Sequence, residues 1–196
     1  MSQYSSNRHL YIGFHGCEKS LAKEFLNRRR DMEPSQNSYD WLGKGCYFWE
    51  NDPLRAEEFA RDIKRCKEPF VIGAVLDLGY CLDLTCRENV DLLKVTYESF
   101  VKELFEIGKV RPNKVPSGAI TDDLLLRFLD CAVIESLHEF NAENGKEEYD
   151  SVRAGFWEGT ELYNTAGFRE KNHIQICIRN PQCILGVFLP DGYVLE

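Results

Sequence analysis

The sequence has no apolar run that approaches the roughly 20 residues needed to cross a membrane as a helix. Its first ten residues, MSQYSSNRHL, contain no apolar core of a secretion signal. There is also no internal repeat and no long low-complexity tract, and a length of 196 residues suits one domain. We therefore expect a single cytoplasmic domain over residues 1–196.

Metal-binding cysteine spacings are also lacking. The eight cysteines include no C-x-x-C pair, and no histidine stands at zinc-finger spacing from the nearest pairs, Cys81/Cys86 and Cys177/Cys183. Several cysteines fall in apolar runs, where a free cysteine behaves as a small hydrophobic residue. The sequence therefore predicts free thiols in a reducing compartment and no bound metal.

Positive charge is the scarcer sign. Lys and Arg number 24 against 32 Asp and Glu, which gives a formal net charge of −8. An acidic chain is repelled by phosphate polymers unless its cations are concentrated locally. Two such concentrations occur, NRRR at 27–30 and IKRCK at 63–67. Each fits either a solvated helix end or a small patch for nucleotide or nucleic-acid phosphates.

Short apolar runs alternate with helical patterns along most of the chain. Helical spacing predicts helices at 18–30 and 51–66, the second with Asp52 as its N-cap. Six runs rich in β-branched and aromatic residues are typical of strands: 10–15, 46–50, 69–78, 151–157, 173–180 and 183–190. The last three are too closely spaced for helices between them, so we expect them to be antiparallel neighbours.

The middle of the chain has a different pattern. Two helices are predicted there, at 88–107 and at 121–140, with Thr121 as the N-cap of the second. They form a helical insertion at about 88–142 in a chain that otherwise alternates strands and helices. The whole pattern predicts an α+β fold with short, mostly antiparallel strands and helices on the outside.

Two stretches, YIGFHGC at 11–17 and DWLGKGCYFWE at 40–50, set a polar ring among glycines beside a strand. His15 alone fits a hydrogen-bonded core histidine as well as a ligand. Glycines such as Gly43 and Gly45 let the backbone approach a flat ligand closely, and the Tyr47 ring beside them can stack on it. Together the two stretches predict one pocket for a flat ligand.

His-Gly at the end of the first strand, with Gly-Lys-Gly-x-Tyr-Phe about thirty residues later, resembles the diphtheria-toxin and poly(ADP-ribose) polymerase branch of the ADP-ribosyltransferases. The resemblance implies a split antiparallel sheet with flanking helices, and NAD as co-substrate without a metal. It implies that His15 binds the adenosine ribose of NAD and that the backbone of Gly16 holds the nicotinamide carboxamide. Tyr47 would stack on the nicotinamide, and Gly45 would lie against the bound NAD.

The third catalytic position departs from that family. A glutamate usually begins its catalytic strand, whereas this strand reads NHIQICI. Gln175 aligns best, and it can orient a ribose 2′-hydroxyl without charge or basicity. His173 shares its face and can supply a base, while Glu158, just before the strand, can approach from a loop. The plainer alternatives are a surface turn residue for Glu158 and a strand-end histidine with a satisfied hydrogen bond for His173.

The resemblance implies a mono-ADP-ribosyltransferase that releases nicotinamide and modifies a macromolecule. RNA or another nucleic acid is slightly favoured over protein as the acceptor, and chain elongation is not expected without the glutamate. The chain also resembles bacterial toxin-like transferases of toxin–antitoxin and anti-phage systems, which implies an antitoxin partner. The alternatives are an RNA 2′-phosphotransferase, an NAD glycohydrolase, and a non-catalytic module that binds ADP-ribose or a partner protein.

Residues outside the two stretches are weaker candidates. The loop at 33–41 lies between them in sequence, and Ser35, Tyr39 and Asp40 are candidates for contacts to ribose or phosphate. Arg153 and Arg179, on the late strands, fit either pyrophosphate contacts or salt bridges at the rim of the site.

Overall fold

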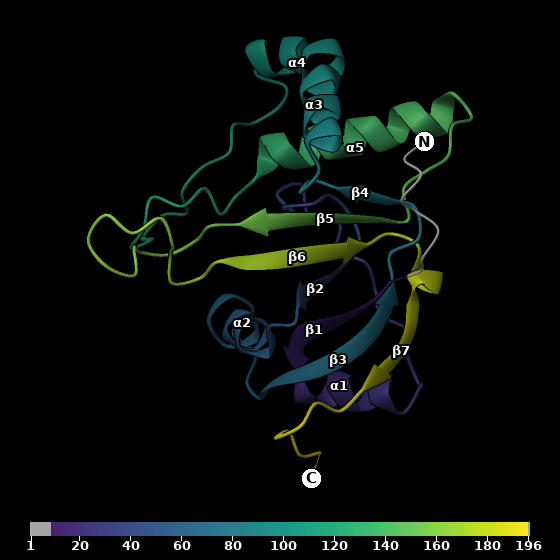
Figure 1. Ribbon diagram of the computed structural model, residues 1–196, viewed down its shortest axis with the longest axis vertical. Coiled ribbons are helices and arrows are strands. Elements are labelled where there is room, and N and C mark those ends of the chain that lie inside the picture. The colour runs from purple at the N-terminus through teal and green to yellow at the C-terminus, as the bar shows by residue number, and fades with distance from the viewer. Residues whose placement is uncertain (1–8, 196) are drawn as a thin grey trace.

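The computed structural model describes residues 9–195 (Figure 1). The fold is α+β, with a seven-stranded mixed sheet in the order β4-β5-β6-β2-β1-β3-β7. Neighbouring strands are antiparallel except β4 and β5, which run parallel. The strands are β1 Leu10–Glu18, β2 Cys46–Glu50, β3 Pro69–Asp77, β4 Cys81–Asp83, β5 Ser151–Phe156, β6 His173–Ile178 and β7 Ile184–Phe188.

Five α-helices, some extended by π-helical turns, flank the sheet within residues 9–195. Asp52 caps α2 as predicted, because its Oδ1 accepts a hydrogen bond from the Arg55 backbone N–H at 3.0 Å. The helices are α1 Lys19–Leu26, α2 Pro53–Glu58 with a π-helical turn at Phe59–Ile63, α3 Arg87–Thr96 with a π-helical turn at Tyr97–Val101, α4 Lys102–Glu106 and α5 Phe128–Glu143.

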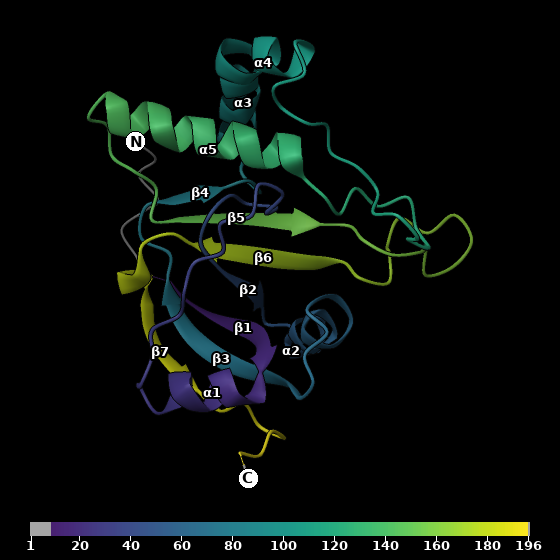
Figure 2. The ribbon, with the colours of Figure 1, turned by 180° about the vertical axis from the view of Figure 1, so that it is seen from behind.

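The helices pack on both faces of the sheet through apolar side chains. On one face Ile134 and Leu137 of α5 pack against Val152 and Cys177, and α2 packs Ala56 against Trp49. On the other face α1 packs its own apolar residues against Cys17 and Ile72. Both ribbon views place α3, α4 and α5 at the β4–β5 end of the sheet and α1 toward the β3–β7 end (Figures 1 and 2). The region between these two groups of helices contains the residues that the sequence marked.

One part of the strand prediction is wrong. The last three strands are not all neighbours: β5 and β6 pair, but β7 lies at the opposite edge against β3. The turn at Pro181–Cys183 redirects the chain, so that the buried Cys183 packs in the same apolar cluster as Leu76 and Ile178. The short strand β4 is an addition, and three residues are too few for periodicity to reveal.

The second inserted helix begins seven residues later than predicted, at Phe128 rather than Thr121. The acidic first turn that suggested the cap is used elsewhere, since Asp123 Oδ2 accepts hydrogen bonds from Thr121 Oγ1 and from the Gly159 backbone N–H. Asn113 instead supplies the missing acceptor, because its Oδ1 bonds the Leu129 N–H at 2.8 Å. The first turn of this helix is therefore capped by a side chain that is distant in the sequence.

Candidate functional site

The pairing of β1 and β2 stops early. β1 pairs with β3 along all nine of its residues, but with β2 only at Gly13/Glu50 and Phe14/Trp49. We call the point beyond Phe14 and Trp49 the β1–β2 fork; its edges carry His15 and Gly16 on β1, and Gly45 and Tyr47 at the start of β2. The two stretches that the sequence singled out are therefore adjacent in the fold.

The backbone of Gly16 points into this fork. The Asn51 N–H donates to the Ile12 carbonyl, and the Lys19 N–H donates to the Glu68 carbonyl. Hydrogen-bonded and non-hydrogen-bonded pairs alternate along an antiparallel ladder, so both bonds put the N–H and C=O of Gly16 on the side of β2 rather than β3. A continued ladder would pair them with Tyr47. The fork thus presents an adjacent donor and acceptor, the complement of a carboxamide.

A hydrogen bond from the His15 side chain replaces the missing ladder bond. Its Nδ1 lies 2.8 Å from the carbonyl oxygen of Tyr47. Because a carbonyl only accepts, Nδ1 carries the proton, and Nε2 of the neutral ring is left as an acceptor. Burial, together with the nearby Lys64 ammonium, lowers the pKa of His15 from 6.5 to about 4. The ring is therefore neutral at pH 7 and suited to accept a hydrogen bond from a hydroxyl.

Lys64, from one of the predicted basic patches, reaches into the fork. Its Nζ donates to the Gly16 carbonyl at 3.4 Å and lies 5.6 Å from the centre of the Phe59 ring. The ammonium therefore holds the acceptor that a carboxamide N–H would use. Sequence reasoning placed Lys64 in a basic patch but not at this position, because only the fold brings the end of the α2 extension to β1.

Replacing Lys64 with methionine is expected to raise the pKa of His15. The substitution removes a positive charge that disfavours the protonated ring, while the burial of His15 remains. An NMR titration of the imidazole protons measures the change, and Lys67→Met serves as a control that removes a nearby exposed cation from the same basic segment. An unchanged pKa of His15 in the Lys64 variant would contradict this electrostatic coupling.

Tyr47 fixes the glycine-containing turn before β2. Its hydroxyl donates to the Gly43 carbonyl at 2.6 Å and accepts from the Leu42 N–H at 2.9 Å. Gly45 has a packing reason to be glycine, since a Cβ there would lie 2.5 Å from the sulfur of Cys177. The register of β2 and β6 places Tyr47 on the same face as Cys177, whereas His15 lies on the other face with Phe48.

The three candidates for the third catalytic position lie where β5 ends and β6 begins. Gln175 stands opposite Trp49 of β2, and His173 stands opposite Phe156 of β5. Glu158 Oε2 accepts from Arg55 Nη2 at 2.7 Å and lies 4.0 Å from His173 Nδ1. The structure thus brings all three close to one another, one strand away from the fork. Arg55, which sequence reasoning missed, holds the Glu158 carboxylate.

Buried polar atoms without a hydrogen-bond partner concentrate here. Such atoms are uncommon in folded proteins and mark places where a ligand or water completes the bonding. Six occur among residues 9–195, and all but His138 Nε2 belong to this region or its wall: Trp49 Nε1, Arg55 Nε, Arg127 Nε, His173 Nε2 and Gln175 Oε1. The start of β6, next to Trp49 where the β1–β2 ladder ends, is therefore a polar site in an otherwise apolar layer.

His173 makes the stability of this region depend on pH. Burial lowers its pKa from 6.5 to about 4, so the folded state binds its proton more weakly than the unfolded state does. This histidine is therefore expected to lower the free energy of unfolding by on the order of 3 kcal/mol as pH drops from about 6.5 to about 4, and His15, whose pKa is also lowered to about 4, adds its own loss in that window. Urea unfolding at a series of pH values measures this loss. His173→Gln should show a smaller loss in the same window; an equal loss would contradict the assignment to His173.

The other sequence candidates are mostly engaged elsewhere. Arg153 forms ion pairs with Glu50 at 2.7 Å and Asp83 at 3.1 Å, and Arg179 pairs with Glu135 at 2.6 Å. These arginines are thus held in salt bridges. In the loop at 33–41, Asp40 accepts hydrogen bonds from Asn37, Tyr39 packs edge-on against Phe128, and Ser35 forms a β-bridge with Gly45.

Neither a metal site nor a membrane helix is found in the described part of the chain. No group of three or more His, Cys, Asp or Glu side chains is placed to hold a metal ion within residues 9–195. Within the same range, no helix combines the length and apolarity that crossing a bilayer requires.

Comparison with known proteins gives a distant relative. The chain is 24% identical over 193 residues to the uncharacterized protein MJ0359 of Methanocaldococcus jannaschii, an alignment that covers 87% of this chain and 83% of that protein. No protein-family model matches the sequence. No solved structure matches it either.

Proposed function

We propose that this protein is a mono-ADP-ribosyltransferase that uses NAD as co-substrate. The observation that carries the proposal is the β1–β2 fork, where the N–H and C=O of Gly16 face away from the β3 ladder. A carboxamide such as that of nicotinamide complements this pair of groups, provided that its N–H displaces Lys64 from the Gly16 carbonyl. The split antiparallel sheet of this enzyme class would account for the short β1–β2 ladder.

The neighbouring side chains fit the rest of NAD. Nε2 of the neutral His15 ring is an acceptor for a ribose hydroxyl, and Tyr47 offers an aromatic ring at the other edge of the fork. Gln175 lies one strand further on with an unpaired Oε1, which can accept a hydrogen bond from the 2′-hydroxyl of the nicotinamide ribose. This set binds and orients the co-substrate without a metal.

The reaction breaks one bond and forms one. The bond between C1′ of the ribose and the nicotinamide nitrogen breaks, and the electron pair leaves with neutral nicotinamide. The cationic ribose that develops is attacked at C1′ by a nucleophile of the acceptor, whose proton is lost to a base. Holding the leaving group and the ribose in fixed orientation lowers this barrier, and a nearby carboxylate stabilises the cation. Glu158 is the carboxylate that we assign to this role; it is held by Arg55, which also pairs with Glu58.

We infer a macromolecular acceptor, with RNA favoured over protein, and a toxin-like role in which an antitoxin protein would neutralise the enzyme. A nucleobase nitrogen can attack without first losing a proton, so it needs less help from a carboxylate, and β6 of this chain carries none. Cytoplasmic NAD and RNA would supply both substrates.

A non-catalytic module that binds ADP-ribose is the second candidate. One observation favours it: β6 carries Gln175 where the enzymes usually carry glutamate, and the Glu158 carboxylate is already paired with Arg55. Such a module would bind NAD or ADP-ribose through the same fork but would release no nicotinamide.

Incubation with NAD separates these candidates. NAD labelled in nicotinamide and NAD labelled in the adenylate are mixed with the protein and with separate pools of RNA, DNA and protein. We expect nicotinamide release and transfer of the adenylate label to the RNA pool. Release of nicotinamide without transfer to any pool would identify an NAD glycohydrolase. Binding without release would identify a binding module, and neither binding nor release would overturn the proposed site.

Two variants test the third position. Glu158→Gln and Gln175→Ala are compared with Glu143→Gln, which changes an exposed glutamate at the end of α5. If Glu158 stabilises the transition state, its variant lowers the rate at saturating NAD at least about tenfold and leaves NAD affinity nearly unchanged. If Gln175 orients the ribose, its variant also weakens NAD binding.

A further inference from the structure

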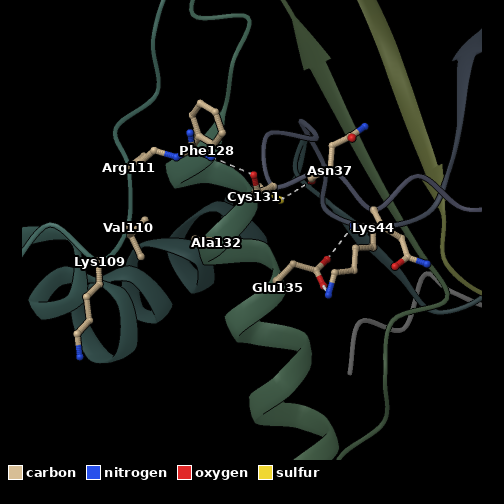
Figure 3. A pocket seen from close by; sticks show the side chains of 11 residues that line it. Asn37, Lys44, Lys109, Val110, Arg111, Phe128, Cys131, Ala132 and Glu135 are labelled. Carbon is tan, nitrogen blue, oxygen red and sulfur yellow. Dashed lines mark hydrogen bonds and ion pairs between the residues drawn. The ribbon is translucent and has the colours of Figure 1, made fainter.

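A pocket of about 360 Å³ lies on the outer side of the loop that leads into β2 (Figure 3). Its walls come from three parts of the chain: the loop residues Gln36–Ser38 and Lys44, the connection from α4 to α5 at Lys109–Arg111, and the first turns of α5. The walls are brought together only by the fold, so no run in the sequence indicated this pocket.

Cations outnumber acids around this pocket. Lys44, Lys109 and Arg111 line it, and Glu135 is its single acidic residue. The Glu135 carboxylate is itself engaged, since Oε1 lies 2.6 Å from Arg179 Nη1 and 2.8 Å from the backbone nitrogen of Lys44. The pocket is therefore a local excess of positive charge in a chain whose formal net charge is −8.

Two of these cations have no acidic partner among residues 9–195. The Arg111 guanidinium lies 3.7 Å from the centre of the Phe128 ring, and its Nη2 donates to Ser38 Oγ at 3.3 Å. The Lys109 ammonium makes no hydrogen bond or ion pair within the same range of residues. Arg127, at the start of α5, is by contrast paired with Asp130. Arg111 is thus oriented by contacts that leave its charge uncompensated.

An aromatic surface adjoins the cations. The Tyr39 ring packs edge-on against Phe128, with ring centres 5.7 Å apart, and remains 39% exposed. Proteins that bind single-stranded nucleic acid usually combine cations, which contact the phosphate backbone, with exposed aromatic rings, on which the bases stack. A cavity of this volume accommodates a phosphate with a sugar or a base, whereas a duplex is far too wide.

We propose that this pocket binds the phosphate backbone of a single-stranded polynucleotide through Lys109 and Arg111. The same loop that lines the pocket is fastened to Tyr47 at Leu42 and Gly43, so a strand bound here passes beside the candidate NAD site. The polynucleotide would be the acceptor of the transferase; that role rests on the proposed function, whereas the binding itself does not.

Fluorescence anisotropy with labelled 12-nucleotide RNA and DNA of the same sequence tests the binding. The double variant Lys109→Ala/Arg111→Ala is compared with Arg87→Ala/Lys102→Ala. The control also removes two cations, but each of these is paired with an exposed acid four residues away on α3 or the α4 segment. We expect the pocket variant to weaken binding about tenfold. The slope of log affinity against log salt concentration should also fall by roughly one to two, which corresponds to the loss of one or two phosphate contacts. The control should change affinity less than about twofold.

Several outcomes would overturn the proposal. Wild-type protein that binds neither oligonucleotide, or equal weakening in both double variants, would remove the pocket as the binding site. Competition by inorganic phosphate as strong as that by the oligonucleotide, compared per phosphate, would show a small-anion site instead. Comparing the affinities for the RNA and the DNA oligonucleotide shows whether ribose or deoxyribose is preferred.

The failure of this proposal is distinguishable from failure of the proposed function. NAD binding should be the same in both double variants, because neither touches the fork. Protein that binds RNA through the pocket but releases no nicotinamide would keep the pocket and overturn the transferase. Nicotinamide release with undiminished RNA affinity in the pocket variant would keep the transferase and overturn the pocket.

Discussion

Gly16→Ala is expected to destabilise the folded protein by at least about 3 kcal/mol, and it is the largest stability effect that we expect from a single methyl group. A Cβ at this position would lie 1.9 Å from the carbonyl oxygen of Ala56 and 3.1 Å from the Cβ of Ala60. Both neighbours belong to α2 and its extension, so relief requires the helix to move away from the sheet rather than one side chain to rotate.

Urea unfolding followed by circular dichroism measures the loss, and Gly186→Ala is the matched control. Gly186 lies in β7, and a Cβ there meets no atom within 4 Å. We expect the control to stay within about 0.5 kcal/mol of wild type. A Gly16→Ala variant with a loss below about 1 kcal/mol would show that α2 yields easily, and the close contact would then say little about stability.

Replacing Tyr47 with alanine is expected to lower nicotinamide release at least about 100-fold, which corresponds to roughly 3 kcal/mol of transition-state stabilisation. The alanine removes the ring proposed to stack on nicotinamide and also the hydroxyl that holds Gly43 and Leu42. Two functions of one side chain are lost together, and a second variant is needed to separate them.

Tyr47→Phe separates the two functions because it keeps the ring and removes only the hydroxyl. The Leu42 N–H and the Gly43 carbonyl then lose a partner, so a loss of stability of about 1–2 kcal/mol is expected. Nicotinamide release should fall less than about tenfold if stacking carries the larger part. Equal loss of release in the two variants would mean that the loop, not the ring, is what the reaction needs. Rates are compared at a temperature where both variants are folded.

Local sequence patterns predicted much of the fold. The aromatic run at Cys46–Glu50 is a strand with the predicted bounds, and the Val- and Ile-rich run from Pro69 is the longest partner of β1. Such elements are determined by their own residues and by burial on the sheet. The position of β7 was missed because it depends on where a three-residue turn at Pro181–Cys183 sends the chain, which no periodicity encodes.

The candidate site was predictable to the same degree. His15, Gly16 and Tyr47 were found because short-range patterns of glycine and aromatic residues stand beside strands. Arg55 and Lys64 were not assigned to the site, since their positions depend on how α2 and its extension fold back over β1. The pocket at Lys109 and Arg111 was missed for the same reason, as the loop that forms one wall is more than sixty residues away in sequence from the other two walls.

The strand order has a consequence for the newly made chain. β6, at His173–Ile178, lies between β5 and β2 and joins them, although it follows both in the sequence and is made after them. Until then the edge of β2 that carries Tyr47 and Trp49 has no partner, and unpaired edges favour association with other chains. Gln175 arrives with the same strand. Whatever this site does begins only once β6 has been made and inserted, which leaves a chain that stops short of β6 inactive and with an open edge on β2.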